Sequence, residues 1–141
     1  MPRSLDLLGD GPFHARLADL AAGDERTTFA QLRQVVRQFV DARDWRQFHS
    51  PKNLSMSLAI EAAELMEHFQ WLTTDASRTV GNDAEKERAI ADEIADVLCY
   101  SLALANELGI DLSTALRNKM VKNEAKYPAA EFRGRFGKSD G

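Results

Sequence analysis

The sequence lacks the features that mark secreted and membrane proteins. Cys99 is its single cysteine, so no intrachain disulfide can form, and its apolar neighbours favour an inert, buried thiol. No apolar run approaches the roughly 18 residues of a membrane-spanning helix, and the N-terminus has no apolar segment typical of a signal peptide. We therefore expect a cytoplasmic protein with no membrane partner.

Basic charge is also scarce. The 141 residues carry 18 Lys and Arg against 22 Asp and Glu, a formal net charge of -4. That balance argues against a broad surface for a nucleic-acid polymer. Strand-like alternation is absent too, while apolar residues recur at helical spacing. We expect one all-α domain, a four-helix bundle, of a size that buries a real core.

Caps and helix breakers set the expected boundaries. Thr27 or Thr28 can cap the first helix, and Asn53 or Ser55 can cap the second. Pro51 disfavours helix at the residue before it. We expect helices at about residues 29–43, 54–72, 84–108 and 112–127, with a loop at 44–51 and a polar turn at 73–83. We expect the domain to span residues 27–128. Before it we expect an irregular arm at 1–26 with a short helix near 13–21, and after it a flexible tail at 129–141.

Two acidic motifs carry most of the functional information, Glu61-Ala-Ala-Glu64 and Glu93-Ile-Ala-Asp96. Residues three apart share a face of a helix, and at about 100° per residue Glu61 and Glu93 fall within apolar stripes. Because a buried, unpaired carboxylate is costly, two such helices side by side need a cation among their oxygen atoms. Hard oxygen ligands suit Mg²⁺ or Mn²⁺. We predict a metal site formed by Glu61, Glu64, Glu93 and Asp96.

The third expected helix is apolar on more than one side. Ile90, Val97 and Leu104 share one face, while Leu98 and Leu102 lie on another. A helix that is apolar nearly all round lies either in the middle of a larger core or between subunits. Four helices have little room to cover it alone, so we expect a homo-oligomer whose subunits share the core.

Three further segments accompany the acidic motifs. They read D-W-R-Q-F-H-S-P-K-N-L at 44–54, F-Q-W at 69–71 and K-M-V-K-N-E-A-K-Y-P at 119–128. Together with the acidic motifs, these segments resemble the MazG-like all-α nucleoside triphosphate pyrophosphatases, and more closely their dCTP pyrophosphatase branch. The resemblance covers roughly residues 28–128. It implies a MazG-type nucleotide pyrophosphohydrolase fold and favours a homotetramer, with a dimer as the alternative.

The resemblance also implies an activity and a set of site residues. Members hydrolyse a nucleoside triphosphate to the monophosphate and pyrophosphate with Mg²⁺, for which Mn²⁺ can substitute, and the four motif carboxylates hold the metal. The expected substrate is dCTP or a modified dCTP, in nucleotide-pool house-cleaning. The W-x-Q-F-H loop and the tryptophan of F-Q-W would enclose the base, and the last helix would meet the triphosphate and sugar. The implied substrate contacts are Trp45, Arg46, Gln47, Phe48, His49, Trp71, Tyr100, Lys119, Asn123, Lys126 and Tyr127.

The charge of such a substrate agrees with this chemistry. A triphosphate carries about four negative charges and needs divalent metal to enter a nest of carboxylates. Glu61 or Glu64 would accept the proton of the attacking water. One position departs from the family pattern, because close relatives can carry a histidine where this chain has Val36. That departure bears on base preference rather than on the reaction.

Three alternatives stay open beside this interpretation. A di-iron carboxylate bundle uses E-x-x-H pairs, and neither acidic motif contains one. A non-enzymatic oligomeric scaffold would pair its acidic residues with Lys or Arg across an interface, and it would release no pyrophosphate. A pyrophosphatase of broader dNTP specificity would share the site but not the base preference.

Overall fold

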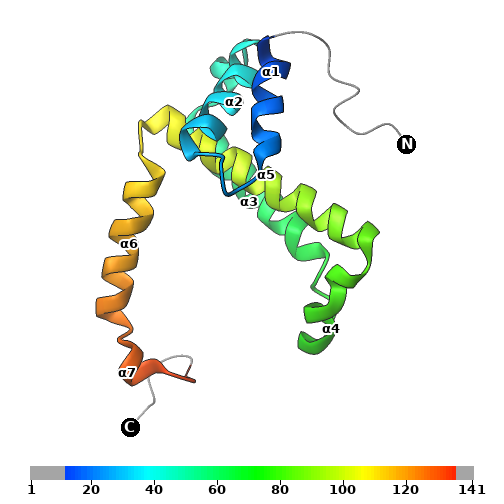
Figure 1. Ribbon diagram of the computed structural model, residues 1–141, viewed down its shortest axis with the longest axis vertical. Helices are drawn as coiled ribbons and strands as arrows, with labels where there is room; N and C mark the ends of the chain where they lie inside the picture. Colours follow the sequence, from blue (N-terminus) through cyan, green and yellow to red (C-terminus); the bar gives the residue numbers. More distant parts are fainter. Residues whose placement is uncertain (1–11, 136–141) are drawn as a thin grey trace. The chain divides into compact units, whose positions relative to one another are not determined.

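The computed structural model describes residues 12–135, and within that range it is helical with no strand. The prediction of an all-α protein is therefore confirmed. The chain divides into two compact units after Gly109, which are described separately. Figure 1 labels the α-helices. The elements are α1 (Pro12–Asp19), η2 (Leu20–Ala22), α2 (Phe29–Asp41), η3 (Trp45–Phe48), α3 (Pro51–Glu67), α4 (Thr74–Thr79), η4 (Val80–Asn82), α5 (Ala84–Leu108), α6 (Leu112–Lys126) and α7 (Ala129–Phe132), where η denotes a 3-10 turn.

The first unit is organised around α5. Helix α3 packs along α5, α2 packs on α5 as well, and α1 packs on α2. Leu54 of α3 is the most deeply buried large side chain, at 1% exposure, and burial of one leucine stabilises a fold by about 1.5–3 kcal/mol. The other buried apolar side chains among the described residues are Val40, Leu102, Ala103 and Ala105. The core thus lies where α2 and α3 meet the C-terminal half of α5.

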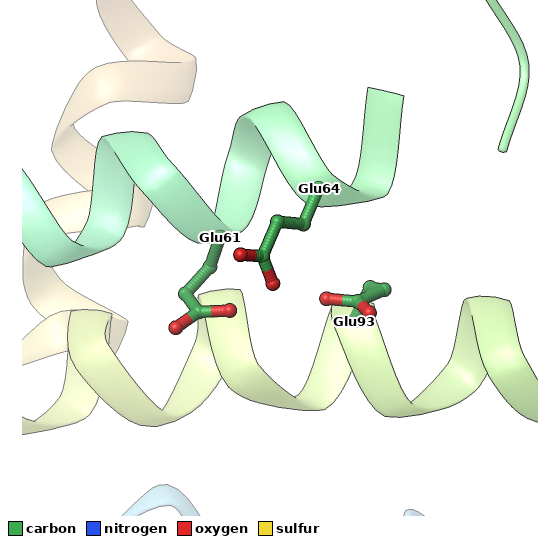
Figure 2. Close-up of side chains that lie close together, drawn as sticks. All are labelled: Glu61, Glu64 and Glu93. Carbon is green, nitrogen blue, oxygen red and sulfur yellow. The ribbon is translucent and has the colours of Figure 1, made fainter. Parts of the chain in front are cut away.

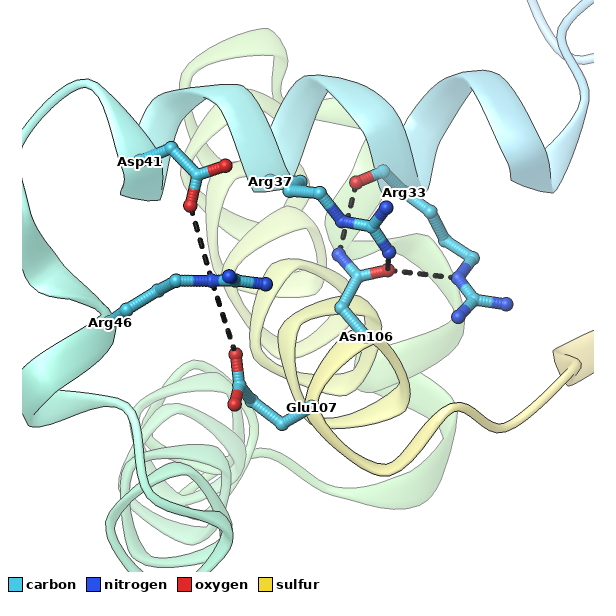
Figure 3. Close-up of polar contacts among 6 residues, drawn as sticks. All are labelled: Arg33, Arg37, Asp41, Arg46, Asn106 and Glu107. Carbon is cyan, nitrogen blue, oxygen red and sulfur yellow. Dashed lines mark hydrogen bonds and ion pairs between the residues drawn. The ribbon is translucent and has the colours of Figure 1, made fainter.

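A polar network fastens α2 to the end of α5. Arg33 donates from Nε to Asn106 Oδ1 at 3.0 Å and from Nη2 to the Ala105 carbonyl at 3.2 Å. Arg37 Nη2 donates to the same Asn106 oxygen at 3.3 Å, and Asn106 Nδ2 returns a bond to the Arg33 carbonyl at 3.0 Å (Figure 3). Cationic groups are favourable near the C-terminal carbonyls of a helix, and these hydrogen bonds hold α2 against the C-terminal end of α5.

Side-chain caps explain where α2 and α3 begin. Of the two predicted caps, Thr28 is the one that begins α2, in a capping box with Gln31. The cap of α3 is Ser50, whose Oγ accepts from the Asn53 amide at 3.2 Å, so the prediction of Asn53 or Ser55 was wrong. Pro51 lacks an N–H group and occupies the first helical position, which needs none. The extended backbone required before proline is the conformation that a capping serine adopts.

Two expected boundaries were misplaced. α3 ends at Glu67 rather than near residue 72, and the residues that follow form tight turns. The predicted polar turn at 73–83 contains α4 and η4. Thr73 starts α4, because its Oγ1 accepts from the Ala76 amide at 3.2 Å. The prediction underestimated how readily one threonine cap starts a short helix in polar sequence.

The two long C-terminal helices follow the prediction closely. α5 spans the expected 25 residues; Asp83 caps its start, and Gly109 ends it in the left-handed region at φ 64°. Asp111 caps α6 by accepting from the Thr114 amide at 2.9 Å. None of the described helices combines the length and apolar character needed to cross a membrane. Helix α1 lies in the predicted arm and α7 in the predicted tail, while residues 1–11 and 136–141 of these segments lie outside the described range.

Candidate metal and nucleotide site

Three predicted metal ligands meet between α3 and α5. Glu61 and Glu64 lie about one turn apart on α3, and Glu93 extends from α5 toward them (Figure 2). One carboxylate oxygen from each lies within 4.8 Å of the other two. The helical period accounts for this convergence, because residues three apart share a face. Packing of α3 along α5 then places the two faces opposite each other.

Asp96, the fourth predicted ligand, lies nearby but outside this group of three. It is exposed on α5, about one turn beyond Glu93. Its negative charge nevertheless contributes to the raised pKa of the Glu61 carboxyl. The structure therefore gathers three of the four predicted carboxylates and leaves Asp96 beside them, and its role as a ligand stays a prediction.

The electrostatics of the cluster are unfavourable without a cation. Burial raises the pKa of Glu61 above its ordinary value, and the charges of Glu64, Asp96 and Glu93 raise it further. Burial also raises the pKa of the neighbouring Cys99 thiol, followed by the charges of Asp96 and Glu61. The raised pKa favours the protonated thiol at neutral pH, and Cys99 is half-buried rather than buried as expected.

The donor set fits a hard divalent cation. Glu93 Oε2 is buried and has no hydrogen-bond partner among the described residues. The ion pairs in residues 12–135 join Arg46 to Asp41 and Glu107 and Lys86 to Asp83, so none reaches the cluster. Carboxylate oxygens without histidine or thiol suit Mg²⁺ or Mn²⁺ rather than softer metals. The absence of histidine from the group also disfavours a di-iron centre.

The predicted base-binding loop is a 3-10 turn fixed by its own side chains. Asp44, before η3, adopts a left-handed backbone at φ 52°, which Asp tolerates better than most residues. Gln47 Nε2 donates to the Asp44 carbonyl at 3.0 Å and to its Oδ2 at 3.1 Å. Asn53 Nδ2 donates to the Phe48 carbonyl at 3.0 Å and closes the loop onto α3. Trp45 and Phe48 remain 42% and 60% exposed, so their rings are accessible to a ligand.

Arg46 attaches this loop to both neighbouring helices. Its Nε lies 3.2 Å from Asp41 Oδ1 of α2 and 3.9 Å from Glu107 Oε1 of α5 (Figure 3). The sequence suggested Arg46 as a substrate contact and did not suggest either partner. Asp41 lies close by in sequence and could have been suspected, but Glu107 is brought near only by packing of α5.

The remaining predicted contacts fall in two places. In the first unit, Trp71 lies in the turns after α3 and is 89% exposed. Tyr100 is half-buried on α5, about one turn beyond Asp96. Four others belong to the second unit, where α6 carries Lys119, Asn123 and Lys126 and is followed by Tyr127. There the Lys126 ammonium lies 5.1 Å from the centre of the Tyr127 ring. The substrate role of all these residues stays a prediction.

Comparison with known proteins places this architecture in a family. The sequence profile of the MazG-like family matches residues 56–138, more than half of the chain. The chain belongs to the MazG-like family. The match extends past residue 128, where we expected the domain to end, and begins after the aromatic loop.

Several individual proteins similar to this chain are named pyrophosphatases. Human dCTP pyrophosphatase 1 is 39% identical over 102 residues, which cover 72% of this chain and 60% of that protein. The rat protein of the same name is 41% identical over 108 residues, covering 76% and 63%. This chain thus spans about three fifths of the length of these curated relatives. A crystal structure of a pyrophosphatase from Archaeoglobus fulgidus matches with a TM-score of 0.66 and 42% identity over 70% of this chain and 91% of that one.

Proposed function

We propose that this protein is a Mg²⁺-dependent nucleoside triphosphate pyrophosphohydrolase, acting on dCTP or a modified dCTP in nucleotide-pool house-cleaning. The observation that carries the proposal is the group of Glu61, Glu64 and Glu93, which has no cationic partner among the described residues. A scaffold would instead take its cationic partners from a neighbouring subunit, and it would release no pyrophosphate. The names of the MazG-like relatives support the reaction class and the substrate.

The residues of α3 and α5 would perform the chemistry. Glu61, Glu64, Glu93 and Asp96 hold the ion, which when bound supplies positive charge at the phosphate chain of the substrate. Glu61 or Glu64 accepts the proton of the water that attacks the α-phosphorus. The bond between the α-phosphorus and its bridging oxygen then breaks, giving the monophosphate and pyrophosphate. The contacts of Lys119, Asn123 and Lys126 with the triphosphate and sugar, which the resemblance implies, stay a prediction for the second unit.

The base would bind at the aromatic side chains of the first unit. Trp45 and Trp71 are 42% and 89% exposed, so each can offer its ring for stacking. Stacking alone does not distinguish one base from another, so discrimination among bases must come from polar groups and from the size of the pocket. His49 is half-buried beside Trp45, with ring centres 6.4 Å apart, and is a candidate for contact with the base edge. Val36 has no side-chain hydrogen-bonding group where relatives can carry a histidine, so the protein would discriminate less strictly among pyrimidines.

A homo-oligomer, a tetramer by preference, would cover apolar surface that one chain leaves open. On α3, Met56 and Ile60 are 55% and 57% exposed, and on α5 Ile94 and Leu98 are 52% and 38% exposed. Apolar residues at such density along two adjacent helices favour subunit contacts. Light scattering tests this, since a monodisperse monomer at micromolar concentration would contradict it. The cytoplasmic location stays a prediction.

The proposed reaction is tested by product analysis on a panel of nucleotides. The protein is incubated with Mg²⁺ and one nucleotide at a time, either a canonical dNTP or 5-methyl-dCTP. The release of pyrophosphate and of orthophosphate is measured in each reaction. We expect pyrophosphate and monophosphate, with the highest kcat/KM for dCTP or its modified form. Release of single orthophosphates would overturn the reaction, and no release would favour the scaffold. Equal kcat/KM for dGTP and dCTP would overturn the substrate assignment alone.

A further inference from the structure

A chain of aromatic rings connects α1 to the predicted base-binding loop. The Phe13 ring of α1 lies 6.2 Å from the Phe39 ring of α2, centre to centre. Phe39 in turn meets Trp45 of η3 edge to face, at 5.8 Å and an interplanar angle of 76°. Both separations fall in the range where aromatic pairs attract each other. Three elements thus contribute one ring each to a continuous path that reaches Trp45, beside which the His49 ring lies.

The middle ring of this path is held from another side. The Arg43 guanidinium carbon lies 3.6 Å from the centre of the Phe39 ring and 5.9 Å from that of Trp45. Arg43, in the turn after α2, also donates from Nη1 to the Phe39 carbonyl at 3.0 Å, which keeps its side chain folded back on α2. A guanidinium stacked on an aromatic face is attracted by the ring. Phe39 therefore has little freedom to move away from Trp45.

Trp45 itself depends on these contacts. It sits on a four-residue 3-10 turn, and a turn of that length holds a side chain less firmly than a long helix does. Its indole is 42% exposed, and part of the remainder rests on Phe39 and beside His49. We infer that Phe13 and Phe39 are positioning residues, through which α1 holds the Trp45 ring ready for a nucleobase. This inference rests on the proposed function for its ligand, while the coupling of α1 to Trp45 can be measured without any activity.

The simplest alternative is that these rings only fill a small core. A core-filling role predicts that loss of Phe13 lowers stability and leaves Trp45 and nucleotide affinity unchanged in the folded protein. A positioning role predicts a change at Trp45 itself, together with a rise in KM that exceeds any fall in kcat. The carboxylates lie on α3 and α5 and are not part of the ring path, so turnover of bound substrate should persist.

The test uses Phe13→Ala with Phe29→Ala as its matched control. Phe29 begins α2 and is 42% exposed, and no ring contact to it occurs within residues 12–135. Both changes are made in a Trp71→Phe background, which leaves Trp45 as the single tryptophan. Quenching of its fluorescence by acrylamide then measures how firmly the indole is held. We expect faster quenching in Phe13→Ala and no change in Phe29→Ala. Equal quenching in the two variants would overturn the inference.

Kinetics of Phe13→Ala with Trp71 intact complete the test. We expect KM for dCTP to rise about three- to tenfold, the range of one aromatic contact, with kcat within about twofold. An unchanged KM would overturn the inference, whereas a parent protein without pyrophosphate release would overturn only the proposed function. If Phe13→Ala does not fold, Phe13→Leu keeps apolar bulk without the ring. Faster quenching than in Phe29→Leu would support the inference, and equal quenching would overturn it.

Discussion

The carboxylate cluster lies on the two longest described helices, of 17 and 25 residues, whereas Trp45 lies on a 3-10 turn of four. The difference extends to their electrostatics. Glu93 Oε2 has no hydrogen-bond partner in the described chain, and Glu61 has a raised pKa. In the loop, Gln47 is hydrogen-bonded and Arg46 is ion-paired. A rigid frame can hold mutually repelling carboxylates at close range, and a bound cation or protonation relieves that repulsion.

This contrast separates chemistry from recognition. Changes in the cluster should abolish turnover and leave the metal-free fold as stable or more stable, because they remove repulsion. Changes in the aromatic loop should weaken substrate binding by degrees and lower stability, because they remove favourable contacts. Each prediction below tests one side of the comparison.

The largest effect is expected at the cluster. Glu61→Gln or Glu93→Gln should lower kcat/KM by at least about a thousandfold, because an amide is a poor ligand for Mg²⁺ and a poor base. Steady-state pyrophosphate release measures this. Glu67→Gln is the matched control, since it makes the same change on an exposed residue of α3 outside the cluster. Near-normal activity in either cluster variant would contradict the assignment.

At the loop, Trp45→Ala should raise KM for every dNTP by about tenfold or more, the effect of losing one stacking surface. kcat should fall less, because the carboxylates are untouched. Full saturation curves separate the two constants. A fall in kcat with KM unchanged would show that Trp45 supports the chemistry rather than the base, and the comparison between the two regions would fail.

The stability of the metal-free protein should respond to Glu61 in a pH-dependent way. Since the pKa of Glu61 is raised in the folded state, its protonated form favours folding, and that contribution is lost as pH rises above its ordinary value of 4.5 through the raised one. Glu61→Gln should therefore melt above the parent at neutral pH in EDTA, and the difference should vanish in acid. A variant that melts below the parent at neutral pH would show that the carboxylate is stabilising.

The smallest effect is expected at Arg46. Its ion pair with Asp41 joins side chains that are 59% and 47% exposed, and such pairs contribute up to about 1 kcal/mol. Arg46→Gln and Asp41→Asn should each cost that much or less by urea unfolding, and the double variant should cost less than their sum. An Arg46 that acts only through its ion pairs would change KM by less than about fivefold when it is replaced by Gln. A fall in kcat/KM above tenfold without loss of stability would indicate that Arg46 contacts the substrate directly.

The same contrast explains what the sequence could predict. The spacing of Glu61, Glu64 and Glu93 is local to two helices, and helical periodicity sufficed to predict that they converge. The partners of Arg46 and the ring path from Phe13 depend on how α1, α2 and α5 pack, and no local pattern encodes that. The cap of α3 was predictable, because proline at the first helical position favours a capping residue just before it.

The most direct test of the central claim is a Mn²⁺ titration followed by electron paramagnetic resonance. Protein-bound Mn²⁺ loses the sharp signal of the hydrated ion, so binding is read without any assay of activity. The parent and Glu67→Gln should bind Mn²⁺ with similar affinity, Mg²⁺ should compete, and Glu93→Gln should bind at least about tenfold more weakly. Equal binding by the parent and Glu93→Gln would show that the carboxylates of α3 and α5 do not hold the metal.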